Sequence, residues 1–190
     1  MANESKTDSD VGIKVMRTLI KRTRQLDATR LVTFVTDQAS VKDHSAFSDA
    51  DLVAVNMYPG SLGRPLADHL DQLDDRARKP AEANIRNRLA AFPDKPMLVT
   101  EFGAMGFRTI RGDAASSEDF QAAYITKMWE AIAGNPELSG GVLWSWADYY
   151  HRRHFQSLGA FGPFGVVSVD RQPKAALKAL AKAYGGSLEP

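Results

Sequence analysis

The sequence predicts an α/β fold built on a parallel sheet. Four short runs rich in apolar and β-branched residues occur at positions 31–35, 52–55, 97–100 and 141–144. Each run is nearly continuously apolar, which is typical of parallel strands that are buried on both faces. Segments with helical periodicity lie between the runs, and this alternation predicts a sheet covered by helices.

The helical segments have recognisable boundaries. A helix is expected over residues 10–26, where apolar residues recur on one face. The residues of that face are Val11, Val15, Leu19 and Leu26. The charged, alanine-containing stretch 65–92 predicts one or two helices. A capping-box pattern at Ser116 predicts another helix, which ends at Gly134. Pro173 favours a first helical turn and predicts the start of the last helix.

The length of the chain bears on which α/β fold is present. Its 190 residues are enough for one domain, which we expect over residues 1–185, followed by a frayed tail at 186–190. A complete (β/α)8 barrel needs about 250 residues, so a barrel interpretation of four strands implies that half of it is missing. A doubly wound open sheet fits the same alternation, and the pattern alone does not choose between the two.

The composition excludes several functional classes. The chain has no cysteine, which excludes disulfides, thiolate zinc sites and cysteine nucleophiles. The net charge is +1, so neither nucleic acid nor an anionic membrane is expected as a partner. No stretch is long and apolar enough to span a bilayer. The first residues are polar and lack the apolar core of a signal peptide, so we expect a cytoplasmic protein.

Polar and aromatic residues follow the predicted strands, where a parallel sheet carries its active site. They are Asn3 and Glu4 ahead of the first helix, Asn56 and Tyr58 after the second strand, Glu101 after the third, and Trp144, Trp146 and Asp148 after the fourth. Paired carboxylates cleave glycosidic bonds, because one attacks the anomeric carbon while the other protonates the leaving oxygen. Aromatic faces pack against sugar rings.

Several motifs occur in a specific order along the chain. They are Ala-Asn-Glu-Ser at 2–5, Leu-Asp-Ala-Thr-Arg-Leu-Val-Thr-Phe at 26–34, Asn-Met-Tyr at 56–58, Thr-Glu-Phe-Gly-Ala at 100–104, Ser-Glu-Asp-Phe-Gln-Ala-Ala-Tyr at 117–124, Trp-Ser-Trp-Ala-Asp at 144–148 and Asp-Arg-Gln-Pro-Lys-Ala-Ala at 170–176. Together they resemble the C-terminal half of the catalytic TIM barrel of glycoside hydrolase family 2, which holds β-galactosidases, β-mannosidases and β-glucuronidases. The resemblance implies a (β/α)8 barrel, of which the chain carries the end of strand 4 to helix 8.

The resemblance also implies a mechanism and a set of roles. The enzyme would be a retaining β-glycosidase with Glu101 as nucleophile and Glu4 as general acid/base. Asn3 would contact the sugar 2-OH, Tyr58 would position Glu101, and Trp144 would form the floor of the sugar site. Further candidate substrate contacts are Asn56, Trp146 and Asp148. Neither a cofactor nor a metal is implied.

One motif of the family is absent and affects the expected substrate. β-Glucuronidases carry an Asn-x-Lys motif before the last helix that binds the sugar carboxylate, whereas residues 161–165 of this chain read Phe-Gly-Pro-Phe-Gly. We therefore expect a neutral hexoside as substrate. Two alternatives remain open: an endo-acting β-glycanase on a related barrel, and an inactive truncated fragment that at most binds sugar.

Two further features concern metals and partners. Asp148, His151 and His154 have a spacing that a metal site can use, but a place at the rim of the sugar site is favoured for them. A barrel cut before strand 5 exposes two sheet edges and opens an interior whose candidate core residues are Val53, Val55, Leu98 and Leu143. Besides a carbohydrate substrate, we therefore expect self-association or a complementing N-terminal half-barrel as partner.

Overall fold

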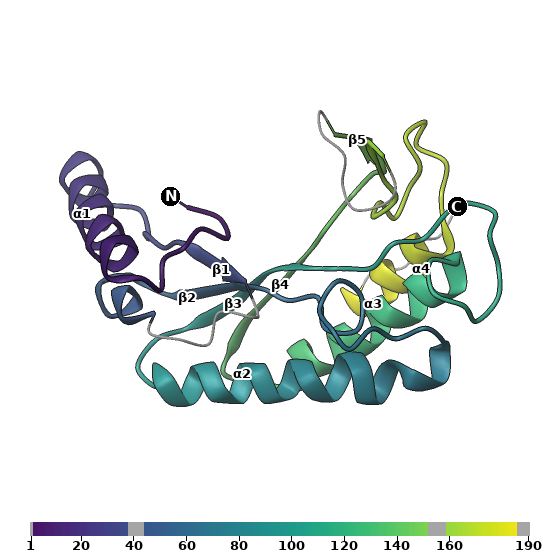
Figure 1. Cartoon of the computed structure of the whole chain (residues 1–190), viewed down its shortest axis with the longest axis horizontal. Helices are drawn as coiled ribbons and strands as arrows, with labels where there is room; N and C mark the ends of the chain where they lie inside the picture. The colour runs from purple at the N-terminus through teal and green to yellow at the C-terminus, as the bar shows by residue number, and fades with distance from the viewer. Residues whose placement is uncertain (1, 38–43, 152–158, 186–190) are drawn as a thin grey trace.

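The computed structural model describes residues 2–37, 44–151 and 159–185 (Figure 1). Its centre is a four-stranded parallel sheet made of β1 (Val35–Asp37), β2 (Val53–Asn56), β3 (Met97–Phe102) and β4 (Leu138–Leu143), in that order. The α/β prediction is confirmed. Doubly wound sheets reverse their strand order at a switch point, whereas this order follows the sequence, as in part of a barrel.

Helices precede, connect and follow the strands, and their bounds are close to those predicted. They are α1 (Asp10–Leu26), α2 (Lys79–Ala91), α3 (Glu118–Ala133) and α4 (Ala175–Ala183), with short helical turns at Ser45–Asp49, Leu70–Gln72 and Asp74–Arg78. The N-cap of α3 is Ser117, one residue after the predicted position, and its side chain accepts a hydrogen bond from the amide of Phe120 at 3.0 Å. A small antiparallel pair, β5 (Tyr149–Tyr150) and β6 (Phe161–Gly162), stands above the sheet (Figure 1).

The main core lies between the sheet and the helices α2 and α3 below it (Figure 1). Val53 and Val55 of β2 belong to this core, so the prediction that they line the barrel interior is wrong. Side chains alternate between the two faces of a strand, and the other face of β2 carries Ala54 and Asn56. Leu98, on the interior side of β3, is only half-buried because nothing in the described residues closes the barrel over it.

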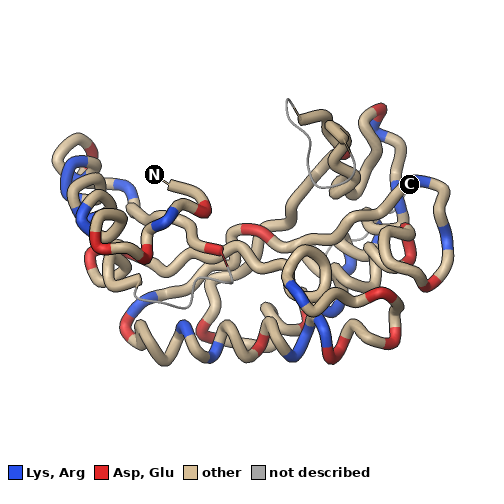
Figure 2. The backbone as a smooth tube through the Cα atoms, in the orientation of Figure 1, with Lys and Arg blue, Asp and Glu red and all other residues tan. Residues whose placement is uncertain are grey.

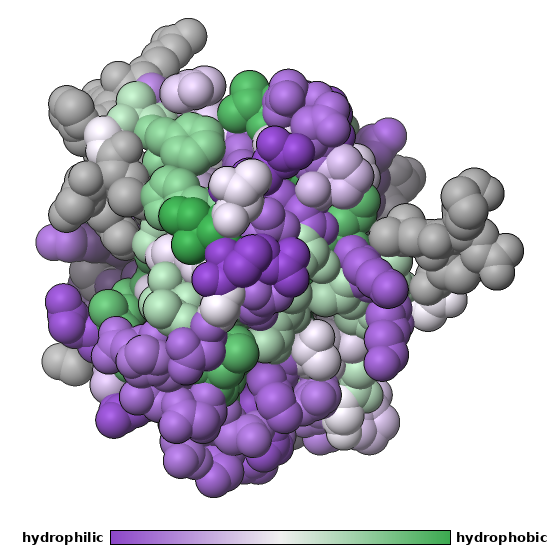
Figure 3. Space-filling model, turned by 90° about the vertical axis from the view of Figure 1, so that its right-hand side faces the viewer, coloured by the Kyte–Doolittle hydropathy of each residue, from purple (hydrophilic) through white to green (hydrophobic). Residues whose placement is uncertain are grey.

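Apolar side chains remain exposed at both ends of the sheet. On α1, Met16 and Ile20 enter the core, whereas the predicted apolar face is exposed, with Val11 at 73% and Leu26 at 71%. Beside β4, the exposed residues are Val142, Trp146 and Tyr184. Figure 3 shows apolar side chains lying among polar ones on the surface seen from the right-hand side of Figure 1.

Surface charges of both signs alternate along the outer helices (Figure 2). Within the described residues, no helix is long and apolar enough to cross a membrane. Residues 186–190, expected to form a frayed tail, lie outside the described part of the chain.

Candidate active site

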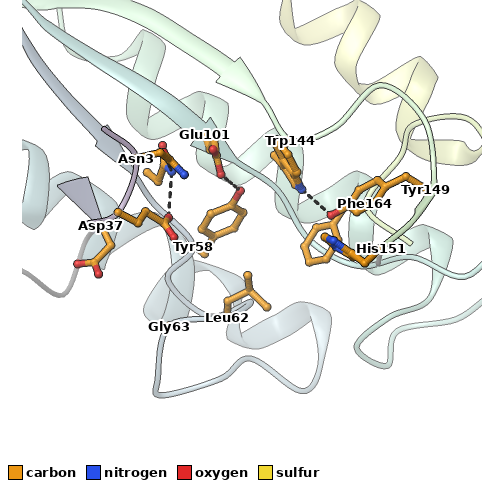
Figure 4. Close-up of a pocket in the computed structure, with 12 residues that line it drawn as sticks. Asn3, Asp37, Tyr58, Leu62, Gly63, Glu101, Trp144, Tyr149, His151 and Phe164 are labelled. Carbon is orange, nitrogen blue, oxygen red and sulfur yellow. Dashed lines mark hydrogen bonds between the residues drawn. The ribbon is translucent and has the colours of Figure 1, made fainter. Parts of the chain in front are cut away.

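A cavity of about 390 Å³ opens where the carboxyl ends of the strands meet (Figure 4). Its lining residues are Asn3, Glu4, Asp37, Asn56, Tyr58, Leu62, Gly63, Glu101, Trp144, Tyr149, His151 and Phe164. The structure thus brings together all the candidate site residues except Trp146 and Asp148. The volume falls within the range of about 300–1,000 Å³ that small-molecule sites occupy.

Glu4 reaches the cavity because the segment before α1 pairs with β1 through one parallel bridge, between Asn3 and Val35. The amide of Glu4 donates to the carbonyl of Val35 at 3.0 Å, and the amide of Val35 donates to the carbonyl of Ala2 at 2.9 Å. Glu4 adopts a φ of 46°, in the left-handed region that non-glycine residues rarely occupy. Such backbone conformations cluster at functional sites, where surrounding contacts hold them.

Asn56 joins the two carboxylate-bearing segments. Its Nδ2 donates to Glu4 Oε1 at 2.9 Å and to Asn3 Oδ1 at 3.1 Å. Its Oδ1 accepts a hydrogen bond from the hydroxyl of Thr100 at 2.8 Å. Asn56 is almost fully buried, so these bonds orient the Glu4 carboxylate relative to β3.

An irregularity in β3 turns Glu101 toward the cavity. Val99 and Phe102 both enter the core although they are three residues apart, whereas residues on one face of a regular strand are two or four apart. The register between β3 and β4 shifts between these two residues, which places an extra residue in the strand. Two consecutive polar residues, Thr100 and Glu101, can therefore both make contacts on the cavity side.

The surroundings of Glu101 act on its protonation in opposite directions. Burial raises its pKa most, and the negative charge of Glu4 raises it further. Hydrogen bonds from Tyr58 and Asn56 lower the pKa, and the net result is a value above the ordinary 4.5. The Tyr58 hydroxyl donates to Glu101 Oε2 at 2.7 Å. Burial, followed by the hydrogen bond to Glu101, raises the pKa of Tyr58, so Tyr58 keeps its proton and remains a donor.

An aromatic wall faces the amides and carboxylates (Figure 4). Trp144 follows β4, and its amide donates to the carbonyl of Phe102 at 2.9 Å. A Cβ at Gly103 would lie 2.2 Å from the carbonyl oxygen of Trp144, so glycine is needed at this close approach. The indole Nε1 of Trp144 donates to the hydroxyl of Tyr149 at 2.8 Å. The segment that carries Glu101 and the aromatic wall are therefore held at a fixed spacing.

His151, expected at the rim of the sugar site, lines the cavity. Several other lining residues were not among the sequence candidates: Asp37, Leu62, Gly63, Tyr149 and Phe164. Asp37 ends β1, and the rule that sites follow strand ends points to it. Tyr149 directly follows the Trp144–Asp148 motif. Phe164 carries no signal of its own in the sequence, because it reaches the cavity only through the packing of the 161–165 segment.

Trp146 and Asp148 lie elsewhere. Trp146 lines a separate hollow with Val142, Leu180 and Tyr184. Asp148 is buried, and its Oδ1 accepts hydrogen bonds from Lys174 Nζ at 3.0 Å and from the amide of Gly165 at 2.8 Å. The carboxylate ties the start of α4 to the loop that carries Phe164. Asp148 thus supports a wall of the cavity without lining it.

Lys174→Met should lower the free energy of unfolding by about 3–5 kcal/mol, because removing one partner of a buried pair leaves an uncompensated charge. Lys174 and Asp148 have side chains that are 0% and 3% exposed. Denaturant unfolding measures the loss. The double variant Lys174→Met with Asp148→Asn should recover part of it, and equal stability of the single variant and the unmodified chain would contradict the prediction.

The described residues contain no cluster of three or more His, Asp or Glu side chains arranged to hold a metal. His154, one member of the metal spacing noted in the sequence, lies outside them. The carboxylate of Asp148 accepts a hydrogen bond from Lys174. His151 instead lines the cavity.

Comparison with known proteins places this geometry in a family. The family model for the TIM barrel domain of glycosyl hydrolases family 2 matches residues 1–187. The chain belongs to glycoside hydrolase family 2. A β-glucuronidase of Streptococcus agalactiae is 28% identical over 97% of this chain, and one of Paenibacillus borealis is 26% identical over 97%. The chain spans 30% of the length of each of these curated relatives.

Solved structures of the family share the fold of this family 2 chain. A β-D-glucuronidase of Dictyoglomus thermophilum superposes with a TM-score of 0.83, at 23% identity over 99% of this chain and 31% of its own. A family 2 β-galacturonidase of Eisenbergiella tayi gives a TM-score of 0.78, at 19% identity over 96% of this chain and 32% of its own. The barrel resemblance seen in the sequence is therefore confirmed. These relatives are named for uronides, which goes against the expected neutral hexoside.

Proposed function

We propose that this chain carries the catalytic centre of a retaining β-glycosidase, with Glu101 as nucleophile and Glu4 as general acid/base. One observation supports this most: Asn56 holds the Glu4 carboxylate beside a Glu101 that Tyr58 orients at 2.7 Å. Paired carboxylates in one cavity are the equipment for double displacement. The family membership of the chain favours the same reaction.

Each step of the reaction has a residue in this cavity. The ionised carboxylate of Glu101 attacks the anomeric carbon and forms a glycosyl ester, while Glu4 gives its proton to the leaving oxygen. Glu4, now ionised, takes a proton from water, and the oxygen of that water displaces Glu101 from the sugar. Tyr58 donates to Glu101 throughout, and its hydrogen bond also stabilises the carboxylate when it leaves again.

A β-D-uronide is the substrate class that we propose. The curated relatives are β-glucuronidases, and one of the similar structures is a β-galacturonidase. This replaces the neutral hexoside expected from residues 161–165. The missing Asn-x-Lys motif is then not an argument against a uronide. It means that other residues must bind the sugar carboxylate.

Stereochemistry tests the proposed reaction. The chain, alone or in the assembly in which it is active, is incubated with 4-nitrophenyl β-D-glucuronide, and proton NMR follows the first sugar formed. We expect the β-anomer to appear before mutarotation produces the α-anomer. An α-anomer formed first, or no hydrolysis of β-glucuronide, β-galacturonide or β-glucoside, would overturn the proposal.

Tyr58→Phe should move the acidic limb of kcat/KM to higher pH and lower its plateau. The nucleophile must be ionised, so activity is lost as the pH falls through the Glu101 pKa, which lies above 4.5. Removing the Tyr58 hydrogen bond removes a contribution that lowers this pKa, so the limb moves upward. A pH–rate profile on an activated aryl glycoside checks this. Tyr150→Phe, an exposed tyrosine outside the cavity, is the control.

A further inference from the structure

No lysine or arginine lines the cavity among the described residues. Among these described lining residues, a sugar carboxylate can be bound by hydrogen-bond donors without a permanent positive charge. Tyr149 has the properties of such a donor. It lies on the aromatic wall (Figure 4) and is close enough to Glu101 for that carboxylate to act on the pKa of its hydroxyl.

The hydroxyl of Tyr149 has its proton available for a ligand. Trp144 Nε1 donates to the Tyr149 oxygen at 2.8 Å, and this is the hydrogen bond that the hydroxyl makes among the described residues. A phenol that accepts in this way still has one O–H to donate. Burial raises the pKa of Tyr149 most, which keeps that proton in place.

Backbone and ring contacts fix the position of Tyr149. Its strand pairs with Gly162 of β6, and a Cβ at Gly162 would lie 2.6 Å from the Tyr149 ring. Only glycine leaves room for the ring there. The His151 ring meets the Tyr149 ring edge-on at a centroid distance of 4.7 Å. The segment 161–165 therefore holds the Tyr149 ring of β5 in place.

Sugar stereochemistry indicates which substituent Tyr149 meets. In a pyranose, C2 and the ring oxygen flank the anomeric carbon, so the C2 and C5 substituents point to opposite sides of it. Asn3 lies on the Glu4 side of Glu101, and its side-chain amide suits the 2-OH, whereas the Nδ2 of Asn56 already donates to Glu4 and Asn3. Figure 4 shows Asn3 and Tyr149 on opposite sides of Glu101 and Tyr58. The C5 substituent therefore points toward Tyr149.

We infer that Tyr149 is a specificity-determining residue whose hydroxyl donates to the C5 carboxylate of a β-D-uronide, with Gly162 providing the space for its ring. The inference rests on the proposed function for the position of the anomeric carbon. Tyr149 would then bind the carboxylate in a cavity whose described lining has no lysine or arginine.

Paired substrates that differ only at C6 test the inference. We expect Tyr149→Phe to lower kcat/KM about 10–100-fold for 4-nitrophenyl β-D-glucuronide, the range for a hydrogen bond to a charged group. The β-D-glucoside should lose only about 2–10-fold, because its C6 hydroxyl is neutral. Gly162→Ala should act in the same direction by displacing the ring. Tyr150→Phe, next on β5 with a side chain that is 72% exposed, should leave the ratio unchanged.

A binding measurement separates failure of this inference from failure of the proposed function. Titration calorimetry with D-glucuronate and D-glucose needs no turnover. We expect tighter binding of D-glucuronate and loss of that preference in Tyr149→Phe. Binding of neither sugar, an equal affinity for both, or a preference that survives Tyr149→Phe would overturn the role of Tyr149. Absence of hydrolysis together with the expected binding would overturn only the proposed reaction.

Discussion

Glu101→Ala is expected to abolish turnover, with a loss of at least about 10⁴-fold in kcat, the scale on which removing a nucleophile acts. Alanine leaves no carboxylate to attack the anomeric carbon, while Tyr58, which now donates to Glu101 at 2.7 Å, remains in place. Added azide can enter the space that the carboxylate occupied. It would then give a glycosyl azide of inverted configuration, which NMR identifies.

Glu4→Ala is the matched variant, because it removes the second carboxylate and keeps the nucleophile. Substrates with poor leaving groups should slow far more than activated aryl glycosides, which leave without a proton. Azide should now attack the glycosyl ester on Glu101 and give a product of retained configuration. Equal losses on both substrate types would argue against Glu4 as the acid, and a retained azide from Glu101→Ala would argue against Glu101 as the nucleophile.

The isolated chain is expected to associate at micromolar concentration and not to persist as an active monomer. Among the described residues, β4 has no strand on its outer side, although the Gly141 carbonyl accepts a hydrogen bond from the Tyr184 hydroxyl at 3.0 Å. Such an open edge can pair with a strand of another chain. Burying one large apolar side chain is worth about 1.5–3 kcal/mol, against a net domain stability of about 5–15 kcal/mol. Leaving several such side chains exposed costs much of that stability.

Sedimentation velocity with a matched pair of variants locates the association. Val142→Lys places a charge on the open edge at a side chain that is 53% exposed, and it should shift the chain toward monomer. Ile110→Lys changes a side chain of similar exposure, 52%, in a loop outside the sheet, and should leave the association unchanged. A sharp, cooperatively unfolding and active monomer of the unmodified chain would contradict the expectation. Adding an N-terminal half-barrel tests the alternative partner.

Local signals in the sequence were sufficient for the order of elements and for most of the site. The apolar runs at 52–55, 97–100 and 141–144 overlap the observed parallel strands, because a strand buried on both faces must be largely apolar. The first run, 31–35, was placed too early, since β1 covers Val35–Asp37 and Leu31 is exposed. The helix at 10–26 has the predicted bounds. Because the carboxyl ends of parallel strands meet at one edge, residues as distant in sequence as Glu4, Asn56 and Glu101 could be assigned to one cavity before their geometry was known.

Tertiary packing decided which faces of the elements are buried and which distant side chains meet, because neither hydrophobic periodicity nor a local motif encodes these contacts. Val53 and Val55 point toward the helices, and Val11 and Leu26 stay exposed, because the side of an element that becomes buried depends on its neighbours in space. Asp148 belongs to the Trp-Ser-Trp-Ala-Asp motif at 144–148, yet its partner Lys174 lies 26 residues away. The sequence by itself determined the alternation of strands and helices, and the resemblance of its motifs to family 2 pointed to the barrel and to the two candidate carboxylates. Only the tertiary structure packs the Tyr149 ring against Gly162 and brings Phe164 to the cavity, since such contacts depend on segments that meet in three dimensions.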